Sequence, residues 1–315
     1  MFSQKPLLIL GYNRPQKTTQ LINQLRSLEP KTILFAVDGP KHGNSVDELK
    51  VREVEKSVTA IDWKCSIETR FRDSNLGLRK AVVDSVEWAL DRFGCVTVIE
   101  DDALPGPEFI QYSEFMLDRY RLENEIAHIN GYNIAPPDSL SNREMQNRIS
   151  IYPASYAWST WERAWKHFDS SLEWGTSVSI EELARITGSL VGALKWKLNF
   201  LDAKAERIDT WAYRWIASMW SKNLKTIGPN INISSYHGWS DGTHTRSRPT
   251  WQQLAISKID WDLLRSEYVP LSADESAEKW LSKNVYSENV RGLIRGLFAS
   301  AALHFLTLKN TNREN

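Results

Sequence analysis

The segment CVTVIEDDALPGPEFIQY, residues 95–112, decides the fold of this chain. Its apolar, β-branched run at residues 96–99 predicts a strand that is buried on both faces, as in parallel sheets covered by helices. Three consecutive carboxylates end this strand, namely Glu100, Asp101 and Asp102. Ligands of open parallel sheets bind outside the carboxyl ends of the strands. The sequence therefore predicts acidic groups at a ligand-binding edge.

These three acidic side chains indicate a metal site. Adjacent carboxylates repel one another unless a cation lies among them, and the hard cations Mg²⁺ and Mn²⁺ prefer oxygen ligands. A metal at such an edge would neutralise charge on a diphosphate leaving group. Asp102, furthest from the buried strand, is the expected ligand, and Glu100 and Asp101 would orient it or contact ribose. A solvated acidic loop is the alternative interpretation.

The chain before the acidic segment alternates between strand-like and helix-like periodicity. Strands are expected at 6–12, 32–37 and 65–71, and helices at 16–28, 46–58 and 78–93. This βαβαβαβ order predicts a parallel, Rossmann-like α/β sheet. The sequence contains neither a glycine-rich dinucleotide fingerprint nor a P-loop, so side chains and a metal would have to hold a nucleotide.

Polar residues follow each of these strands and should meet on one rim. Arg14, after the first strand, is a candidate contact for a diphosphate. Asp38, after the second, is a candidate acceptor for a base or a ribose, and Arg79 begins a helix whose N–H groups add to its charge. The simpler alternatives are a surface arginine, a turn aspartate bonded to its own backbone and a solvated helix start.

The second half of the chain is rich in tryptophan, with 14 Trp in all. Tryptophan suits stacking on sugar rings and equally suits an ordinary core. The sequence predicts strands at 126–132, at the start of 149–161 and at 226–234, and a loop at 139–148. Helices are predicted at 107–123, 162–168, 180–187, 191–205 and 210–222.

Two further residues are candidates for chemistry. Asp209 precedes a predicted helix in IDTWAYRW, where a carboxylate can act as a general base or only as a helix N-cap. His244 lies in the loop at 235–249 and is a candidate metal or phosphate ligand.

The composition excludes several classes of protein. Lys plus Arg and Asp plus Glu each number 39, and this balance gives no reason to expect nucleic acid as a partner. Two cysteines are too few for a disulfide framework, so we expect a cytoplasmic protein. The apolar segment 292–308, interrupted by Arg295 and His304, has two interpretations. It either packs on the rest of the chain or lies in the plane of an anionic membrane, here the inner face of the cell membrane.

Several motifs together resemble GT-A fold nucleotide-sugar glycosyltransferases. They are LLILGYNRP, FAVDGP, DSNLGLRKAV, VTVIEDDALPGPEFIQY and INGYN, in this order between residues 7 and 133. They are similar to the N-acetylglucosaminyltransferase I-like and the bacterial family 2-like groups. In the former an E-D-D replaces the D-x-D of other GT-A enzymes. The later motifs SYAWSTWERAWKHFD, IDTWAYRW and NINISSYHGWSDGTHT agree in order.

The resemblance implies a UDP-sugar donor with Mn²⁺ or Mg²⁺. Arg14 would contact the diphosphate, Asp38 the uracil and Asp102 the metal. Arg79 and Asp101 are further candidates for the nucleotide site because of their positions at a helix start and at the end of the acidic strand. The chain departs from the family at the base, because one aspartate, not two, precedes Thr210 and Trp211. Three residues therefore stay open as the general base: Asp209, Glu206 and Asp241.

The resemblance further implies a metal-dependent, inverting hexosyl- or N-acetylhexosaminyltransferase acting on a saccharide or lipid-linked glycan in surface polysaccharide synthesis. The expected GT-A domain spans 1–250, with a nucleotide-sugar half at 1–133 and an acceptor half at 134–250. A helical extension covers 251–315. The alternatives are a sugar nucleotidyltransferase and a noncatalytic carbohydrate-binding protein that uses its tryptophans.

Overall fold

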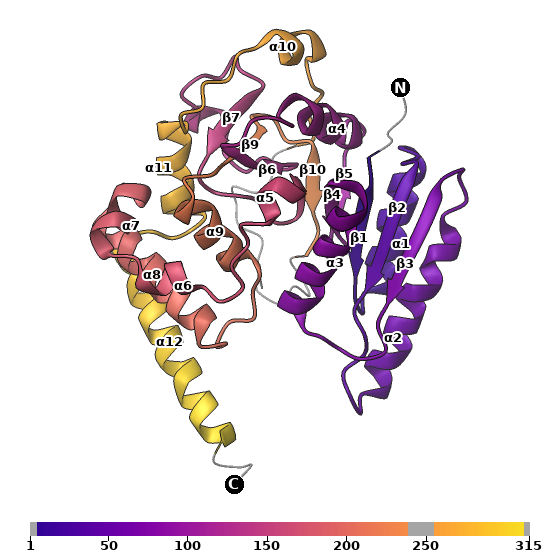
Figure 1. The fold of residues 1–315 in the computed structure, drawn as a ribbon, viewed down its shortest axis with the longest axis horizontal. Helices are drawn as coiled ribbons and strands as arrows, with labels where there is room; N and C mark the ends of the chain where they lie inside the picture. The colour runs from indigo at the N-terminus through magenta and orange to yellow at the C-terminus, as the bar shows by residue number, and fades with distance from the viewer. Residues whose placement is uncertain (1–4, 239–254, 312–315) are drawn as a thin grey trace.

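A computed structural model describes residues 5–238 and 255–311, with side chains up to residue 302 (Figure 1). The fold is α/β, centred on an eight-stranded sheet in the order β3-β2-β1-β4-β8-β6-β9-β7. Six of these strands run in one direction, and β8 and β7 run against them. The expectation of a mostly parallel sheet flanked by helices is confirmed.

The first half of the sheet follows the sequence prediction closely. Its strands are β1 (Leu7–Gly11), β2 (Thr32–Val37), β3 (Ser66–Phe71) and β4 (Cys95–Glu100), all parallel. The helices between them are α1 (Pro15–Arg26), α2 (Ser45–Lys56) and α3 (Leu78–Phe93). Because the polar residues after β1, β2 and β4 lie at carboxyl ends, they share one edge of the sheet.

Apolar side chains of β1 alternate between two cores. Leu7 and Ile9 pack with α1, α2 and α4 (Phe109–Arg119) on one face of the sheet. Leu8 packs with α3 and with α9 (Ala212–Ser221) on the other. Both faces are thus covered by helices, which explains why residues 96–99 are apolar throughout.

The second half of the sheet departs from the prediction in strand direction and length. Residues 149–161 hold parts of two strands, β7 (Asn147–Ser150) and β8 (Ala157–Trp161), so the predicted loop at 139–148 is wrong at its end. Both strands are antiparallel to their neighbours. A short apolar run gives a strand but not its direction, which depends on the connection.

The single strand predicted at 226–234 is wrong, because the structure divides it. β9 (Lys225–Pro229) pairs with β6 (Ile126–Asn130) and ends at Pro229, which has no N–H to donate. β10 (Ser234–Tyr236) leaves the main sheet and pairs with β5 (Ala103–Pro105), the strand directly after the acidic cluster. This small antiparallel ribbon places Tyr236 and His237 next to the acidic residues.

Most described tryptophans belong to the core and not to a surface. Trp158, Trp196 and Trp215 are fully buried, and Trp158 stacks on Trp165 and Trp211. Their packing joins α5 (Glu162–Trp165) and α9 to the sheet, and α8 (Leu190–Lys204) to α9. The tryptophan content is therefore largely explained by packing.

The remaining helices lie around the sheet. They are α6 (Glu173–Ser177), α7 (Ile180–Thr187), α10 (Trp261–Ser266), α11 (Glu275–Asn284) and α12 (Val290–Thr311), together with the short turns η1 (Ser57–Ala60) and η2 (Pro137–Ser139). Within the part of the chain that the structure describes, no helix is long and apolar enough to cross a membrane.

Candidate active site

A cavity of about 800 Å³ opens at the carboxyl ends of β1, β2 and β4. Side chains after each of these strands line it, and the loop before α9 closes its opposite side. The lining residues include Tyr12, Arg14, Asp38, Asn75, Glu100, Asp101 and Asp102 near the strand ends, Tyr156 and Tyr236 next to the acidic residues, and Asp209, Thr210, Trp211 and Tyr213 before and at the start of α9. The cavity thus brings together most of the residues that the sequence singled out.

The guanidinium of Arg14 lies between two of the three acidic side chains. Its Nη1 donates to Oδ1 of Asp101 at 3.0 Å and to Oδ2 of Asp102 at 2.7 Å. Arg14 is placed there because Pro15 starts α1 directly after β1, beside β4. The cation expected among the carboxylates is therefore provided in part by the chain itself.

Burial raises the pKa of all three carboxyl groups. For Glu100 the pKa lies well above its usual range, because burial is reinforced by the charges of Asp102 and Asp101. The pKa of Asp101 rises to about 7 through burial, although Arg14 opposes the shift. Burial also raises the pKa of Asp102, against the opposing effects of Arg14 and Lys17. Ionisation of all three carboxyl groups would place more negative charge here than Arg14 alone compensates.

The segment after β10 lies directly on Asp102. The backbone N–H of His237 donates to the Asp102 carbonyl at 2.7 Å, and Tyr236 hydrogen-bonds to the Asp102 side chain. A Cβ on Gly238 would lie 2.5 Å from Oδ2 of Asp102, so a side chain there would collide with the carboxylate. Sequence reasoning missed Tyr236, although the motif that contains it was noted.

One oxygen of Asp102 fits the expected divalent cation. Its Oδ1 is buried and has no hydrogen-bond partner within the described part of the chain. Over the same residues, no group of three or more His, Cys, Asp or Glu side chains is arranged around a metal position. Mg²⁺ and similar ions are commonly held by one or two carboxylates, with water and substrate phosphates completing the shell. The residues present therefore suit a metal that binds together with a diphosphate.

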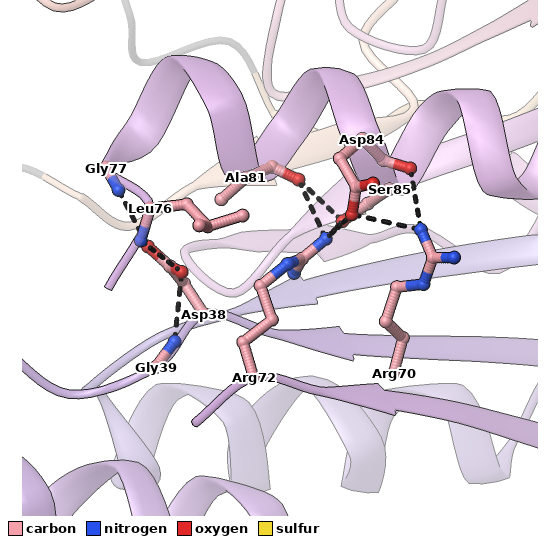
Figure 2. Close-up of polar contacts among 9 residues, drawn as sticks. All are labelled: Asp38, Gly39, Arg70, Arg72, Leu76, Gly77, Ala81, Asp84 and Ser85. Atoms are coloured by element: carbon pink, nitrogen blue, oxygen red, sulfur yellow. Dashed lines mark hydrogen bonds and ion pairs between the residues drawn. The ribbon is translucent and has the colours of Figure 1, made fainter. Parts of the chain in front are cut away.

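The carboxylate of Asp38 holds the turn that leads into α3 (Figure 2). Oδ1 accepts from the N–H groups of Gly39 and Leu76 at 2.9 and 3.0 Å, and Oδ2 accepts from Gly77 N and Asn75 Nδ2 at 3.2 and 3.0 Å. Gly77 adopts φ +82°, which few other residues tolerate. These four bonds use the ordinary acceptor capacity of a carboxylate.

Arg72 is a cavity residue that sequence reasoning missed. Its guanidinium forms an ion pair with Asp84 of α3 and donates to the Ser85 hydroxyl at 3.0 Å, while Arg70 binds Asp84 from the side (Figure 2). The charge of Arg72 opposes the burial that raises the pKa of Asp38. The spacing of Arg70 and Arg72 could have indicated this pairing, because residues two apart in an extended segment lie on the same face.

Asp209 lines the cavity and is not a helix N-cap. α9 starts at Ala212 after an N-cap residue, Trp211, that contributes no side-chain bond, so the cap interpretation is wrong. The Asp209 side chain is half exposed, and its Oδ1 lies 3.6 Å from Nε of Arg79. Arg79 also donates to Glu206 at 2.7 Å, and neither Arg79 nor Glu206 is among the lining residues.

His244 and Asp241, two residues that the sequence predicts to act in the site, lie outside the described residues.

Asp47 of α2 is a further residue that sequence reasoning missed, because the many charged residues of its helix predict a solvent-exposed element. It accepts from Tyr12 OH and Asn13 Nδ2, both at 2.6 Å, and so fixes the loop that carries Arg14.

Comparison with known proteins gives structural matches alone. No protein-family model matches the sequence, and no curated protein matches it. Among solved structures, the chain is similar to a mannosyltransferase, PcManGT, from Pyrobaculum calidifontis in complex with GDP-Man and Mn²⁺. The identity is 8%, the TM-score 0.38, and the match covers 71% of this chain and 70% of that one.

Two further solved structures are similar at the same low level. Glucosyl-3-phosphoglycerate synthase from Mycobacterium tuberculosis, in complex with Mn²⁺, UDP-glucose and phosphoglyceric acid, is 11% identical with a TM-score of 0.33, covering 90% of this chain and 79% of that one. Mouse xyloside xylosyltransferase 1 is 9% identical with a TM-score of 0.33, covering 70% and 83%. The fold assignment rests on the sheet order described above.

Proposed function

We propose that this chain is a metal-dependent glycosyltransferase that moves a sugar from a UDP-sugar to a saccharide or lipid-linked glycan. One observation supports this most. A single cavity joins Arg14, Asp101, Asp102, whose buried Oδ1 has no partner within the described residues, and Asp209, which lies beside Gly77 of the turn that Asp38 holds. A diphosphate donor needs positive charge on one side, and an acceptor hydroxyl needs a base on the other.

On the donor side, the chain would bind the nucleotide diphosphate at the edge of the parallel strands. Asp102 would hold Mn²⁺ or Mg²⁺ through Oδ1, with His244 as a second candidate ligand, and the bound ion would supply charge to the leaving diphosphate. Arg14, fixed by the two aspartates, adds a second positive charge there. Asp38 would act on the uracil side through the turn at 75–77 that it holds.

On the acceptor side, Asp209 would take the proton of the acceptor hydroxyl as that oxygen attacks the anomeric carbon. Attack from the face opposite the diphosphate inverts the anomeric configuration. Tyr156 and Tyr236, whose ring centroids lie 4.1 Å apart in a stacked pair, line the cavity next to Asp102 and offer aromatic surface to a sugar ring. Arg79 would contribute to nucleotide binding from the start of α3.

The proposal is tested by measuring UDP release from a panel of UDP-sugars with Mn²⁺, with and without EDTA. We expect Asp102→Asn to lower kcat/KM at least about a hundredfold, because the metal loses a charged ligand. Asp262→Asn, on the exposed surface of α10, is the matched control and should leave turnover unchanged. Full activity of Asp102→Asn, or turnover in EDTA, would refute the metal role.

The same assays separate the alternatives. A sugar nucleotidyltransferase would release pyrophosphate from UTP and a sugar phosphate. A noncatalytic carbohydrate-binding protein would bind glycans without responding to UDP or Mn²⁺.

We further propose that the chain is divided into a nucleotide-sugar half at 1–133, an acceptor half at 134–250 and a helical extension at 251–315. We also propose a cytoplasmic location and a role in surface polysaccharide synthesis.

A further inference from the structure

The helix α12 turns its small residues toward the protein. Gly292 is buried, and a Cβ on Gly296 would lie 3.2 Å from the Leu198 side chain of α8. One turn further, the hydroxyl of Ser300 donates to Oδ1 of Asp202 at 2.7 Å. Positions 292, 296 and 300 therefore form the face that packs on α8, since residues four apart share a helix face.

The opposite face of α12 exposes large apolar side chains. Val290, Ile294, Leu297 and Phe298 are 60%, 47%, 53% and 73% exposed. A helix at the surface of a soluble domain normally turns such residues toward the core and its polar residues toward water. α12 has the reverse arrangement, so its outer face is suited to an apolar environment.

The neighbouring helix α8 also exposes apolar side chains. Leu190, Leu194 and Leu201 of α8 are exposed, and their spacing places them on one face of that helix. α8 and α12 lie side by side, away from the strands β1, β2 and β3 (Figure 1). We name the exposed residues of the two helices the α8–α12 surface: Leu190, Leu194, Leu201, Val290, Ile294, Leu297 and Phe298.

The exposed charge of α8 and α12 themselves is positive. Arg291 and Arg295 are exposed on α12 beside the apolar residues, and the sequence of α12 contains no Asp or Glu. The one acidic residue of α8, Asp202, is buried and paired with Arg207 at 2.7 Å. Exposed arginines that flank an apolar helix face bind anionic lipid head groups while the apolar residues enter the acyl boundary.

We propose that the α8–α12 surface docks on an anionic membrane. Phe298 and Leu297 would insert below the head groups, and Arg291 and Arg295 would contact lipid phosphates. A second copy of the chain complements this surface less well, because a two-fold contact would place the arginines of both copies in one interface without an exposed acidic residue of α8 or α12 to pair with them. The proposal concerns a surface separate from the cavity and does not depend on the proposed enzyme activity.

The test is flotation of the full chain with vesicles of phosphatidylcholine, with or without about one-third phosphatidylglycerol. We expect binding to the anionic vesicles, and a loss of about tenfold or more in Phe298→Asp and in the double variant Arg291→Glu, Arg295→Glu. Leu122→Asp is the control, because Leu122 is 79% exposed after α4 and outside this surface. It should bind as the unchanged chain does.

Three results would overturn the proposal. One is the absence of binding to anionic vesicles, and another is binding that neither α12 variant weakens. The third is a concentration-dependent dimer, seen by sedimentation, that Phe298→Asp abolishes in a chain that does not bind vesicles. That last result would assign the surface to a second copy. Circular dichroism of each variant checks that the fold is intact.

Discussion

Arg14 and Asp102 form an ion pair that leaves half of the carboxylate unused. Nη1 of Arg14 lies 2.7 Å from Oδ2 of Asp102, whereas Oδ1 is buried and has no partner within the described residues. Burial of a carboxylate oxygen without a partner costs free energy unless a ligand compensates it. Arg14 thus stabilises one oxygen of the Asp102 carboxylate, and the other oxygen is available to a bound metal cation.

Replacing Arg14 tests the internal cation. Arg14→Gln removes the positive charge between Asp101 and Asp102, both nearly inaccessible to water, and we expect a loss of about 3 kcal/mol in the free energy of unfolding. Urea unfolding at neutral pH measures it. Arg26→Gln, which removes an exposed pair with Asp62, is the control and should have little effect. Equal effects of the two variants would contradict the assigned role of Arg14.

Asp38 is expected to act on stability before it acts on ligands. In Asp38→Asn, the amide group would face the N–H donors that now approach the carboxylate, leaving at least one of them unpaired at a cost of about 1–3 kcal/mol. Chemical unfolding measures this. Asp73→Asn, exposed in the same loop, should be neutral. If Asp38→Asn unfolds at the same urea concentration as the unchanged chain, the four hydrogen bonds of Asp38 do not contribute to stability.

The N-terminal half of the sheet could be predicted from the sequence because each element there follows a simple local rule. Strands at 32–37 and 96–99 are largely continuous apolar runs. Glycines flank α3, with Gly77 directly before it and Gly94 directly after it, and a glycine after the last turn is common at helix ends. The sheet edge at which the cavity opens follows from strand order alone. Arg14, Asp38 and Asp102 were placed on that edge without knowledge of their contacts.

Contacts between distant segments could not be predicted. The pairing of β10 with β5, which brings Tyr236 to Asp102, depends on a register that the sequence does not encode locally. The role of Asp38 is a further example, because its four donors include backbone groups nearly forty residues away along the chain. Nor does periodicity reveal that α12 turns its glycines inward, since both faces of that helix contain apolar or small residues.

Asp209 and Glu206 can be distinguished by kinetics, because both lie near Arg79 but only Asp209 lines the cavity. If the proposed base is Asp209, Asp209→Asn lowers kcat about 10²–10⁴-fold with a smaller change in KM. Glu206→Gln, which removes the closer partner of Arg79, should change kcat little. The reverse order would assign the base to Glu206, and an effect of neither would favour Asp241.

The last prediction concerns the pH dependence of stability through Glu278 of α11. Burial is the main cause that raises the pKa of this carboxyl to about 7, and a buried oxygen, Oε1, has no partner within the described residues. The folded chain therefore binds the Glu278 proton more tightly than the unfolded chain does. This contribution to stability is present at acidic pH and is lost as the pH rises from about 4.5 to about 7.

Glu278→Gln removes the proton-binding group and keeps a neutral side chain of similar size. We expect the free energy of unfolding of Glu278→Gln, relative to the unchanged chain, to rise by about 2–3 kcal/mol between pH 5 and pH 8. Urea unfolding at a series of pH values measures this difference. Glu275→Gln, exposed on the same helix, is the control and should give a difference independent of pH over this range. A constant difference for Glu278→Gln would mean that the carboxyl is solvated, because burial is the main reason that the folded chain holds this proton more tightly.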